Sequence, residues 1–182
     1  MQLDERRRLA YLDAIGIDVW LPRGAVEAPL DAPAGSETPV GELGDLDWNA
    51  LEGRVADCQL CELAKTRTQT VFGVGNTDAA WMVVGEAPGA EEDRRGEPFV
   101  GRAGKLLDEM LHSIGQRRES VFIANILKCR PPQNRDPKPA EAAACRAYLD
   151  RQIALVKPDI VLAVGRIAAQ NLLGSDEPVG RL

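Results

Sequence analysis

Short apolar runs alternate with amphipathic segments along the chain from residue 46 onward. The run at 81–84 ends at a glycine, which is typical of a buried strand that meets a turn. Two similar runs predict further strands at 120–127 and 159–165. Helical spacing of apolar residues predicts helices at 46–55, 104–115, 139–156 and 166–174.

The apolar stripe of the 104–115 helix is expected to pack against the sheet. Its members recur at helical spacing and are Leu106, Leu107, Met110, Leu111 and Ile114. Pro139 is expected in the first turn of its helix, and Gly174 is expected to end the last helix. Strands that alternate with helices predict an α/β fold, a three-layer α/β/α sandwich with a central parallel sheet. Ligands of such sheets bind at the carboxyl ends of the strands.

The N-terminal part has a different pattern. Residues 1–20 are expected to contain a short amphipathic helix, and 21–45 form a linker rich in Pro, Ala and Gly. The globular domain is expected to span 46–182. A helix on a flexible tether suits a partner protein, although a dispensable tail fits the same pattern. No apolar run is long enough to span a bilayer and no signal peptide is evident, so we expect a cytoplasmic protein without a membrane partner.

The net charge of −6 is unevenly distributed along the 182 residues. Residues 1–57 hold 5 Lys or Arg and 12 Asp or Glu, a net of −7, and the remainder holds 17 and 16, a net of +1. Residues 128–138 carry four basic residues and one acidic one. A local basic loop of this kind can contact a phosphate backbone although the whole chain is acidic.

The four cysteines of the chain suggest a metal site. Cys58 and Cys61 form a C-x2-C pair, and Cys129 and Cys145 are separated by 15 residues. Cysteines of this spacing in a cytoplasmic chain bind metal more often than they form disulfides. Because the second pair is loose, the spacing leans toward an iron–sulfur cluster, and zinc and free thiols stay open at this point.

The loop sequence GEAPGAEEDRRGEPFVGRAG, residues 85–104, follows the first strand and is expected to hold a ligand. It matches neither the P-loop nor the dinucleotide-binding fingerprint, and its acidic residues disfavour phosphate. A divalent metal site and a solvated structural turn remain alternatives. A third interpretation uses this loop together with the motifs CQLC upstream and NILKCRPPQNR downstream.

These three motifs, in this order, resemble family 4 of the uracil-DNA glycosylases, the iron–sulfur group of that superfamily. The resemblance covers about residues 50–174. It implies a monofunctional enzyme of base excision repair that hydrolyses the N-glycosidic bond of deoxyuridine in single- or double-stranded DNA. It also implies a [4Fe-4S] cluster held by the four cysteines and a monomeric protein.

The resemblance assigns roles to individual residues of this chain. Asn125 is expected to read the edge of the flipped uracil, because an amide both donates and accepts a hydrogen bond. Phe99 is expected to stack on the base. Glu86 and Ala87 are expected at the edge of the base, and Glu86, then Asp93, are the candidates for holding the attacking water.

Arg130 and Arg135 are expected to lie along the DNA backbone on a loop that the cluster would fix, although solvated surface positions fit these arginines equally well. The superfamily has a further motif with a histidine that donates to uracil O2, and this chain does not contain it. His112, the only histidine, is expected on a helix face and not in that role. We therefore expect a C-terminally truncated fold with little or no activity by itself. A non-catalytic protein that binds uracil or DNA is the alternative function, and a zinc-stabilised scaffold without a DNA role is a further one.

Overall fold

The structure, a computed structural model, describes residues 43–181. Contacts divide the chain into Met1–Ser36 and Glu37–Leu182, and all the described residues fall in the second unit. The N-terminal helix expected within residues 1–20 and nearly all of the expected linker lie outside the described residues.

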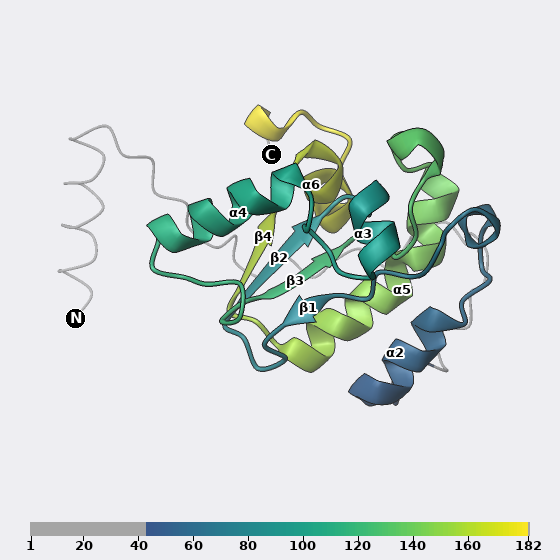
Figure 1. The fold of residues 1–182 in the computed structure, drawn as a ribbon, viewed down its shortest axis with the longest axis horizontal. Helices are drawn as coiled ribbons and strands as arrows, with labels where there is room; N and C mark the ends of the chain where they lie inside the picture. Colours follow the sequence, from purple (N-terminus) through teal and green to yellow (C-terminus); the bar gives the residue numbers. More distant parts are fainter. Residues whose placement is uncertain (1–42, 182) are drawn as a thin grey trace, which may run out of the picture. The chain divides into compact units, whose positions relative to one another are not determined.

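A four-stranded sheet forms the centre of the described unit (Figure 1). Its strand order is β1 (Val74–Gly75), β3 (Phe122–Asn125), β2 (Trp81–Gly85) and β4 (Ile160–Ala163). Strand β2 is parallel to both β3 and β4, whereas the short β1 runs antiparallel to β3. The parallel β2, β3 and β4 confirm the three predicted strands, and β1 was not predicted because two residues carry no periodicity.

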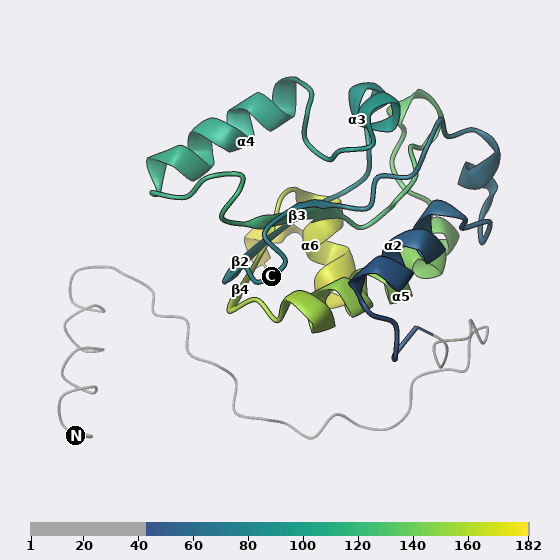
Figure 2. The ribbon, with the colours of Figure 1, turned by 60° about the horizontal axis from the view of Figure 1, so that its bottom comes forward.

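Helices cover both faces of the sheet (Figure 2), which confirms the α/β fold class with three layers. Helix α4 (Arg102–Ser113) lies on one face. Helices α5 (Pro139–Val156) and α6 (Arg166–Leu173) lie on the other, and α2 (Trp48–Ala56) packs against α5. The remaining elements are short: η2 (Glu62–Lys65), α3 (Ala90–Arg95), η3 (Pro132–Asn134) and η4 (Val179–Arg181).

The alternation of side chains in β2 and β3 divides the core between the two faces of the sheet. Met82, Val84, Phe122 and Ala124 point toward α5, where they meet Leu149 and two of the cysteines. Val83 and Ile123 point the other way and pack against Leu107 and Leu111 of α4. The buried strands are thus apolar on both sides, as strands covered by helices must be.

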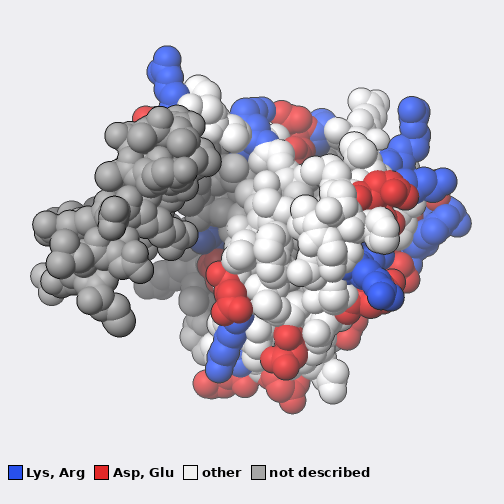
Figure 3. All heavy atoms as spheres, turned by 90° about the vertical axis from the view of Figure 1, so that its left-hand side faces the viewer, with Lys and Arg blue, Asp and Glu red and all other residues white. Residues whose placement is uncertain are grey.

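Two apolar segments are more exposed than their patterns predict. Of the predicted stripe only Leu107 and Leu111 are buried, whereas Leu106, Met110 and Ile114, which follows the end of α4, are 54–63% exposed. The edge strand β4 is exposed along Ile160, Val161 and Leu162. Figure 3 shows one face of the molecule, on which uncharged residues fill the middle and charged ones lie mainly at the margins. Periodicity marks apolar positions, but the neighbouring elements decide which of them are covered.

None of the helices within residues 43–181 combines the length and the apolar character that crossing a bilayer requires.

Candidate functional site

The site is built where β2 and β3 end side by side. Gly85 and Asn125 are register partners in the parallel pair, so the loops that follow both strands leave the sheet at the same edge. The backbone N–H groups of Ile126 and Leu127 donate to the carbonyls of Gly85 and Glu86 at 2.9 and 3.0 Å. These bonds extend the pairing by two residues and fix the two loops against each other.

Gly85 is a glycine because two side chains meet above its Cα. A Cβ at this position would lie 2.5 Å from Oδ1 of Asn125 and 2.5 Å from Cζ of Phe99, closer than any side chain can approach. The amide of Asn125 and the ring of Phe99 therefore share the space over the end of β2.

Asn125 as a residue is almost fully buried, at 2% exposure, and its side-chain amide makes no hydrogen bond within residues 43–181. No side-chain polar atom in that range is both sealed from solvent and unpaired, so this amide is open to solvent. Buried amides are normally paired. This one faces a cavity of about 340 Å³, within the roughly 300–1,000 Å³ of small-molecule sites. The cavity is lined by Glu86, Ala87, Pro88, Gly89, Glu92, Phe99, Ala103, Asn125, Pro131, Asn134, Arg135 and Val164.

Glu86 is half-buried at the cavity wall, and its pKa is raised above the ordinary value for a glutamate. Burial is the main cause, because it disfavours the charged form. The like charge of Asp136 raises the pKa further, and Arg166 opposes the shift. A carboxylate with a raised pKa in a cavity is suited to accept a proton.

Asp93, the other candidate for holding water, occupies a different place. It is 4% exposed, and its two carboxylate oxygens accept from the backbone N–H of Thr68 at 2.9 and 3.1 Å. It does not line the cavity. The structure thus brings Glu86, Ala87, Phe99 and Asn125 together and leaves Asp93 outside, where it ties α3 to the segment after η2.

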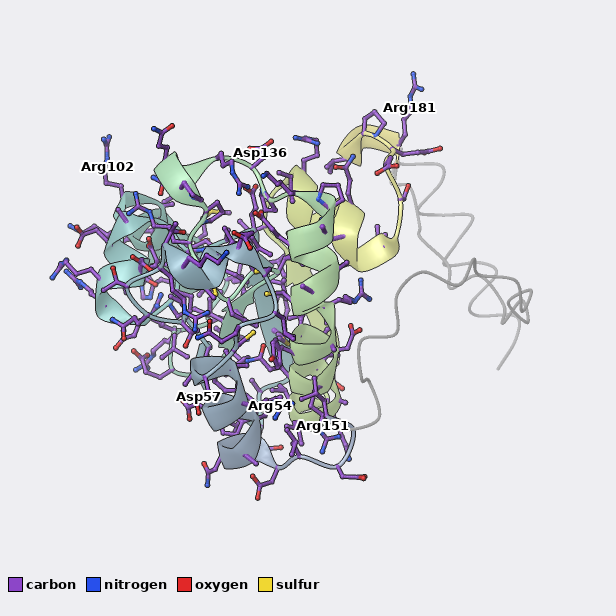
Figure 4. All side chains as sticks on the ribbon, turned by 90° about the vertical axis from the view of Figure 1, so that its right-hand side faces the viewer. Arg54, Asp57, Arg102, Asp136, Arg151 and Arg181 are labelled. Carbon is purple, nitrogen blue, oxygen red and sulfur yellow. The ribbon has the colours of Figure 1, made fainter. Side chains whose placement is uncertain are left out.

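The two arginines predicted as phosphate contacts lie on the loop between β3 and α5. Arg130 donates from Nε to Asn134 at 2.8 Å. Arg135 forms a two-pronged ion pair with Glu141 of α5, at 2.8 and 2.6 Å, and this pair lowers the pKa of Glu141. Asp136 of the same loop and Arg102 of α4 lie on the side of the molecule opposite Arg54, Asp57 and Arg151 (Figure 4).

The four cysteines converge on the other side of β3. Cys129 and Cys145 are buried in the core below the sheet, and Cys61 packs against the same cluster. Cys58 packs next to Tyr148 in the adjoining cluster. All four are free thiols, and charges on Cys58 and Cys61 would act on Cys129.

Two hydrogen bonds reach the buried sulfurs. Nη1 of Arg67 donates to Sγ of Cys129 at 3.1 Å, and the backbone N–H of Lys128 donates to Cys145. Burial nevertheless raises the pKa of Cys129, and that of Cys145 to about 12. The thiols are therefore neutral by themselves, and bound metal would have to deprotonate them. In the described part of the chain, no three His, Cys, Asp or Glu side chains stand in an arrangement that could hold a metal ion.

A buried polar network joins the cysteine region to the cavity. Nζ of Lys128, 1% exposed, donates to the backbone carbonyl of Asn125 at 2.9 Å and to Oε1 of Gln152 at 2.5 Å. Gln152 in turn donates to the carbonyl of Phe72 at 2.9 Å. Burial lowers the pKa of Lys128 to about 7. The network holds the turn after Asn125 against α5.

Comparison with known proteins agrees with this arrangement. A family model described as Uracil DNA glycosylase superfamily matches residues 72–181, more than half of the chain. The chain belongs to this superfamily. The matched segment of this superfamily member contains the cavity and two of the four cysteines, whereas Cys58 and Cys61 precede it.

Several curated relatives are named Type-4 uracil-DNA glycosylase. The chain is 57% identical to the protein of Archaeoglobus fulgidus over 116 residues, which are 64% of this chain and 58% of that relative. The protein of Thermotoga maritima is 52% identical over 115 residues (63% and 60%), and that of Saccharolobus solfataricus 52% over 131 residues (71% and 60%). The chain thus spans about 60% of the length of these relatives.

Sequence reasoning missed several residues that shape the site. Glu92, Asn134 and Val164 line the cavity without having been singled out, and Lys128 and Gln152 support Asn125 from behind. Nothing in the sequence around Lys128, which precedes Cys129, indicates that its side chain is buried. His112 is exposed on α4 and does not line the cavity, as expected for a residue on a helix face.

Proposed function

We propose that this protein is a uracil-DNA glycosylase that hydrolyses the bond between uracil and deoxyribose in DNA. The observation that carries the proposal is the unpaired amide of Asn125 in the cavity at the end of β3, next to the ring of Phe99. The names of the relatives at 52–57% identity support the substrate.

Asn125 selects the base by its donor and acceptor. Its amide N–H donates to uracil O4 and its carbonyl accepts from N3–H. Cytosine presents the opposite pair, so both groups would stay buried without partners, at a cost of about 1–3 kcal/mol each. Phe99 stacks on the flipped base, and Ala87 leaves room at its edge.

In the reaction, the C1′–N1 bond breaks, its electron pair leaves with uracil, and water adds at C1′. Glu86 holds this water and accepts its proton, and its position at the cavity favours it over Asp93. The proposed enzyme is monofunctional, with water and not an amine as nucleophile.

The four cysteines are proposed to hold a [4Fe-4S] cluster. Three of the thiols pack in one core cluster and Cys58 packs in the adjoining one, and thiolates are the ligands that such a cluster needs. The cluster would bind Cys58, Cys61, Cys129 and Cys145 and would fix the loop between β3 and α5. Its role here is structural.

That loop is proposed to contact DNA phosphates through Arg130 and Arg135. Since Arg135 is paired with Glu141 on one side, its remaining donors and those of Arg130 are the ones a phosphate would use. The same proposal has the protein act on DNA as a monomer in the cytoplasm. We also propose that the expected N-terminal helix binds a partner protein.

Uracil release tests the proposed function. The protein is purified without oxygen and incubated with a single-stranded oligonucleotide that contains one uracil, and free uracil and abasic sites are measured. Release from the uracil strand, and none from a matched cytosine strand, supports the proposal. Tight binding that prefers uracil without any release would agree with the expectation that these 182 residues have little activity by themselves and would favour a non-catalytic uracil-binding protein for this chain. Release would contradict that expectation, and an absence of both binding and release would overturn the proposal.

A further inference from the structure

Phe99 has a backbone conformation that an aromatic residue rarely adopts. Its φ is +53°, in the left-handed region, where the Cβ crowds the following carbonyl. A residue held there needs surrounding contacts that determine its conformation. The contacts around Phe99 come from two side chains that flank it from opposite directions.

The first of these side chains is Arg118, in the segment between α4 and β3. Its Nη1 donates to the carbonyl of Phe99 at 3.1 Å, and its Nη2 donates to the carbonyl of Pro98. The planar guanidinium presents both donors at a fixed spacing, so one side chain binds two successive carbonyls. Asp108 of α4 lies 3.4 Å from Nη1 and orients the guanidinium, and the Arg118 side chain is only 19% exposed.

The second is Glu92 of α3, which binds the backbone N–H groups of the next two residues. Its Oε1 accepts from the backbone N–H of Val100 and of Gly101, each at 2.9 Å. Gly104 completes the enclosure, because any Cβ there would overlap the carbonyl of Phe99. Peptide groups on both sides of Phe99 are thus fixed, and its ring is directed to the place above Gly85 where the amide of Asn125 lies.

Arg118 does not line the cavity, and it contacts neither the amide of Asn125 nor the carboxylate of Glu86. We propose that Arg118 is a positioning residue for uracil, which holds Phe99 in its left-handed conformation so that the ring is in place to stack before the base arrives. The proposal rests on the proposed function, since it takes uracil as the ligand that Phe99 stacks on.

Binding measurements on the full chain test this role. The dissociation constants are measured for a single-stranded oligonucleotide with one uracil and for the same strand with a base-less tetrahydrofuran site at that position. Their ratio isolates the contribution of the base from the contribution of the backbone. In Arg118→Met we expect this ratio to fall by about tenfold, because a charge-assisted anchor of the loop is lost.

Arg117→Met is the matched control, since it removes the same charge at an exposed neighbouring position. Its ratio is expected to stay unchanged. Arg118→Lys keeps the charge and replaces Arg118→Met if that variant unfolds. Its ratio is expected to stay close to that of Arg118→Met, because an ammonium group lacks the rigid fork that reaches both carbonyls.

A double-mutant comparison separates positioning from a general structural role. In a Phe99→Ala background, Arg118→Met is expected to cause no further loss of the ratio, because there is no ring left to position. A full tenfold loss in that background would overturn the proposal, as would an unchanged ratio in Arg118→Met.

Hydrogen exchange of the Val100 and Gly101 amides gives a result that does not need uracil. Exchange is expected to be faster in Arg118→Met and unchanged in Arg117→Met. Unchanged exchange in Arg118→Met would overturn the proposal whatever the oligonucleotides show. A third outcome separates the two ideas. If exchange is faster in Arg118→Met but the wild-type protein binds the uracil strand and the base-less strand equally, Arg118 anchors the loop and uracil is not the ligand.

Discussion

Asn125 is the residue on which the choice of base depends in the proposed function. It combines a position at the end of a buried strand with an amide that the described residues leave unpaired. The sequence placed it correctly because an asparagine that follows an apolar run marks a strand end. Its lack of a partner is a tertiary property, since it depends on what the loops after β2 and β3 leave open.

Asn125→Ala is expected to lower the preference for a uracil over a cytosine strand by about tenfold or more, because the paired donor and acceptor are lost. Binding titrations with the two strands measure this preference. Asn49→Ala on the exposed face of α2 is the control and should leave it unchanged. An unchanged preference in Asn125→Ala would mean that another group reads the base.

The pKa of Glu86 depends on two charged neighbours. Removing the like charge in Asp136→Asn is expected to lower this pKa, and removing the opposite charge in Arg166→Gln is expected to raise it. Carboxyl ¹³C NMR titration of Glu86 measures both shifts, with Asp150→Asn as a distant control. Because Glu86 must be ionised to accept a proton, uracil release should decline on the acid side at a lower pH in Asp136→Asn than in the wild type. If neither substitution changes the pKa of Glu86, burial alone accounts for its raised value.

At the scale of elements, the loop from β2 to α4 was predicted to hold a ligand, and several of its residues line the cavity. The short helix within it was not predicted. This helix is α3, whose Glu92 and Asp93 point to opposite partners: Glu92 binds the backbone at Val100 and Gly101, and Asp93 binds Thr68. Six residues are too few for helical periodicity to be visible. Glu92 and Asp93 therefore looked alike in the sequence and serve different contacts in the fold.

Gly104→Ala tests how tightly this loop packs on α4. Alanine normally stabilises a helix relative to glycine, but here its Cβ would overlap the carbonyl of Phe99. We expect a loss of about 1–3 kcal/mol in the free energy of unfolding and a weaker preference for uracil. Urea titration measures the first and binding the second.

Gly53→Ala is the matched control on the exposed side of α2, where no atom lies within 4 Å of the added Cβ. It is expected to stabilise the protein by up to about 1 kcal/mol. Equal and stabilising effects of both substitutions would contradict the close packing of Phe99 against α4.

At the scale of the whole molecule, the cysteine region and the cavity lie on either side of the turn after β3. Lys128 connects them: its backbone N–H donates to Cys145, and its side chain donates to the carbonyl of Asn125. A substitution among the cysteines is therefore expected to affect the position of Asn125 through Lys128.

Substitution of any one of the four cysteines by serine is expected to remove the proposed cluster, with loss of bound iron and of the visible absorption of the anaerobically purified protein. Iron and zinc analysis of the wild type and the four variants measures this. We also expect lower stability and a weaker uracil preference in Cys145→Ser, through Lys128. Zinc in place of iron in the wild-type protein would contradict the cluster.

The sequence by itself determined the fold class, the three parallel strands and the strand ends that carry Gly85 and Asn125, because apolar runs that stop at turn residues are local signals. Only the tertiary structure decided which apolar residues of α4 are covered, which of Glu86 and Asp93 lines the cavity, and that Arg118 and Lys128 support Phe99 and Asn125. These outcomes depend on contacts between residues far apart in the chain, and a local pattern contains no information about them.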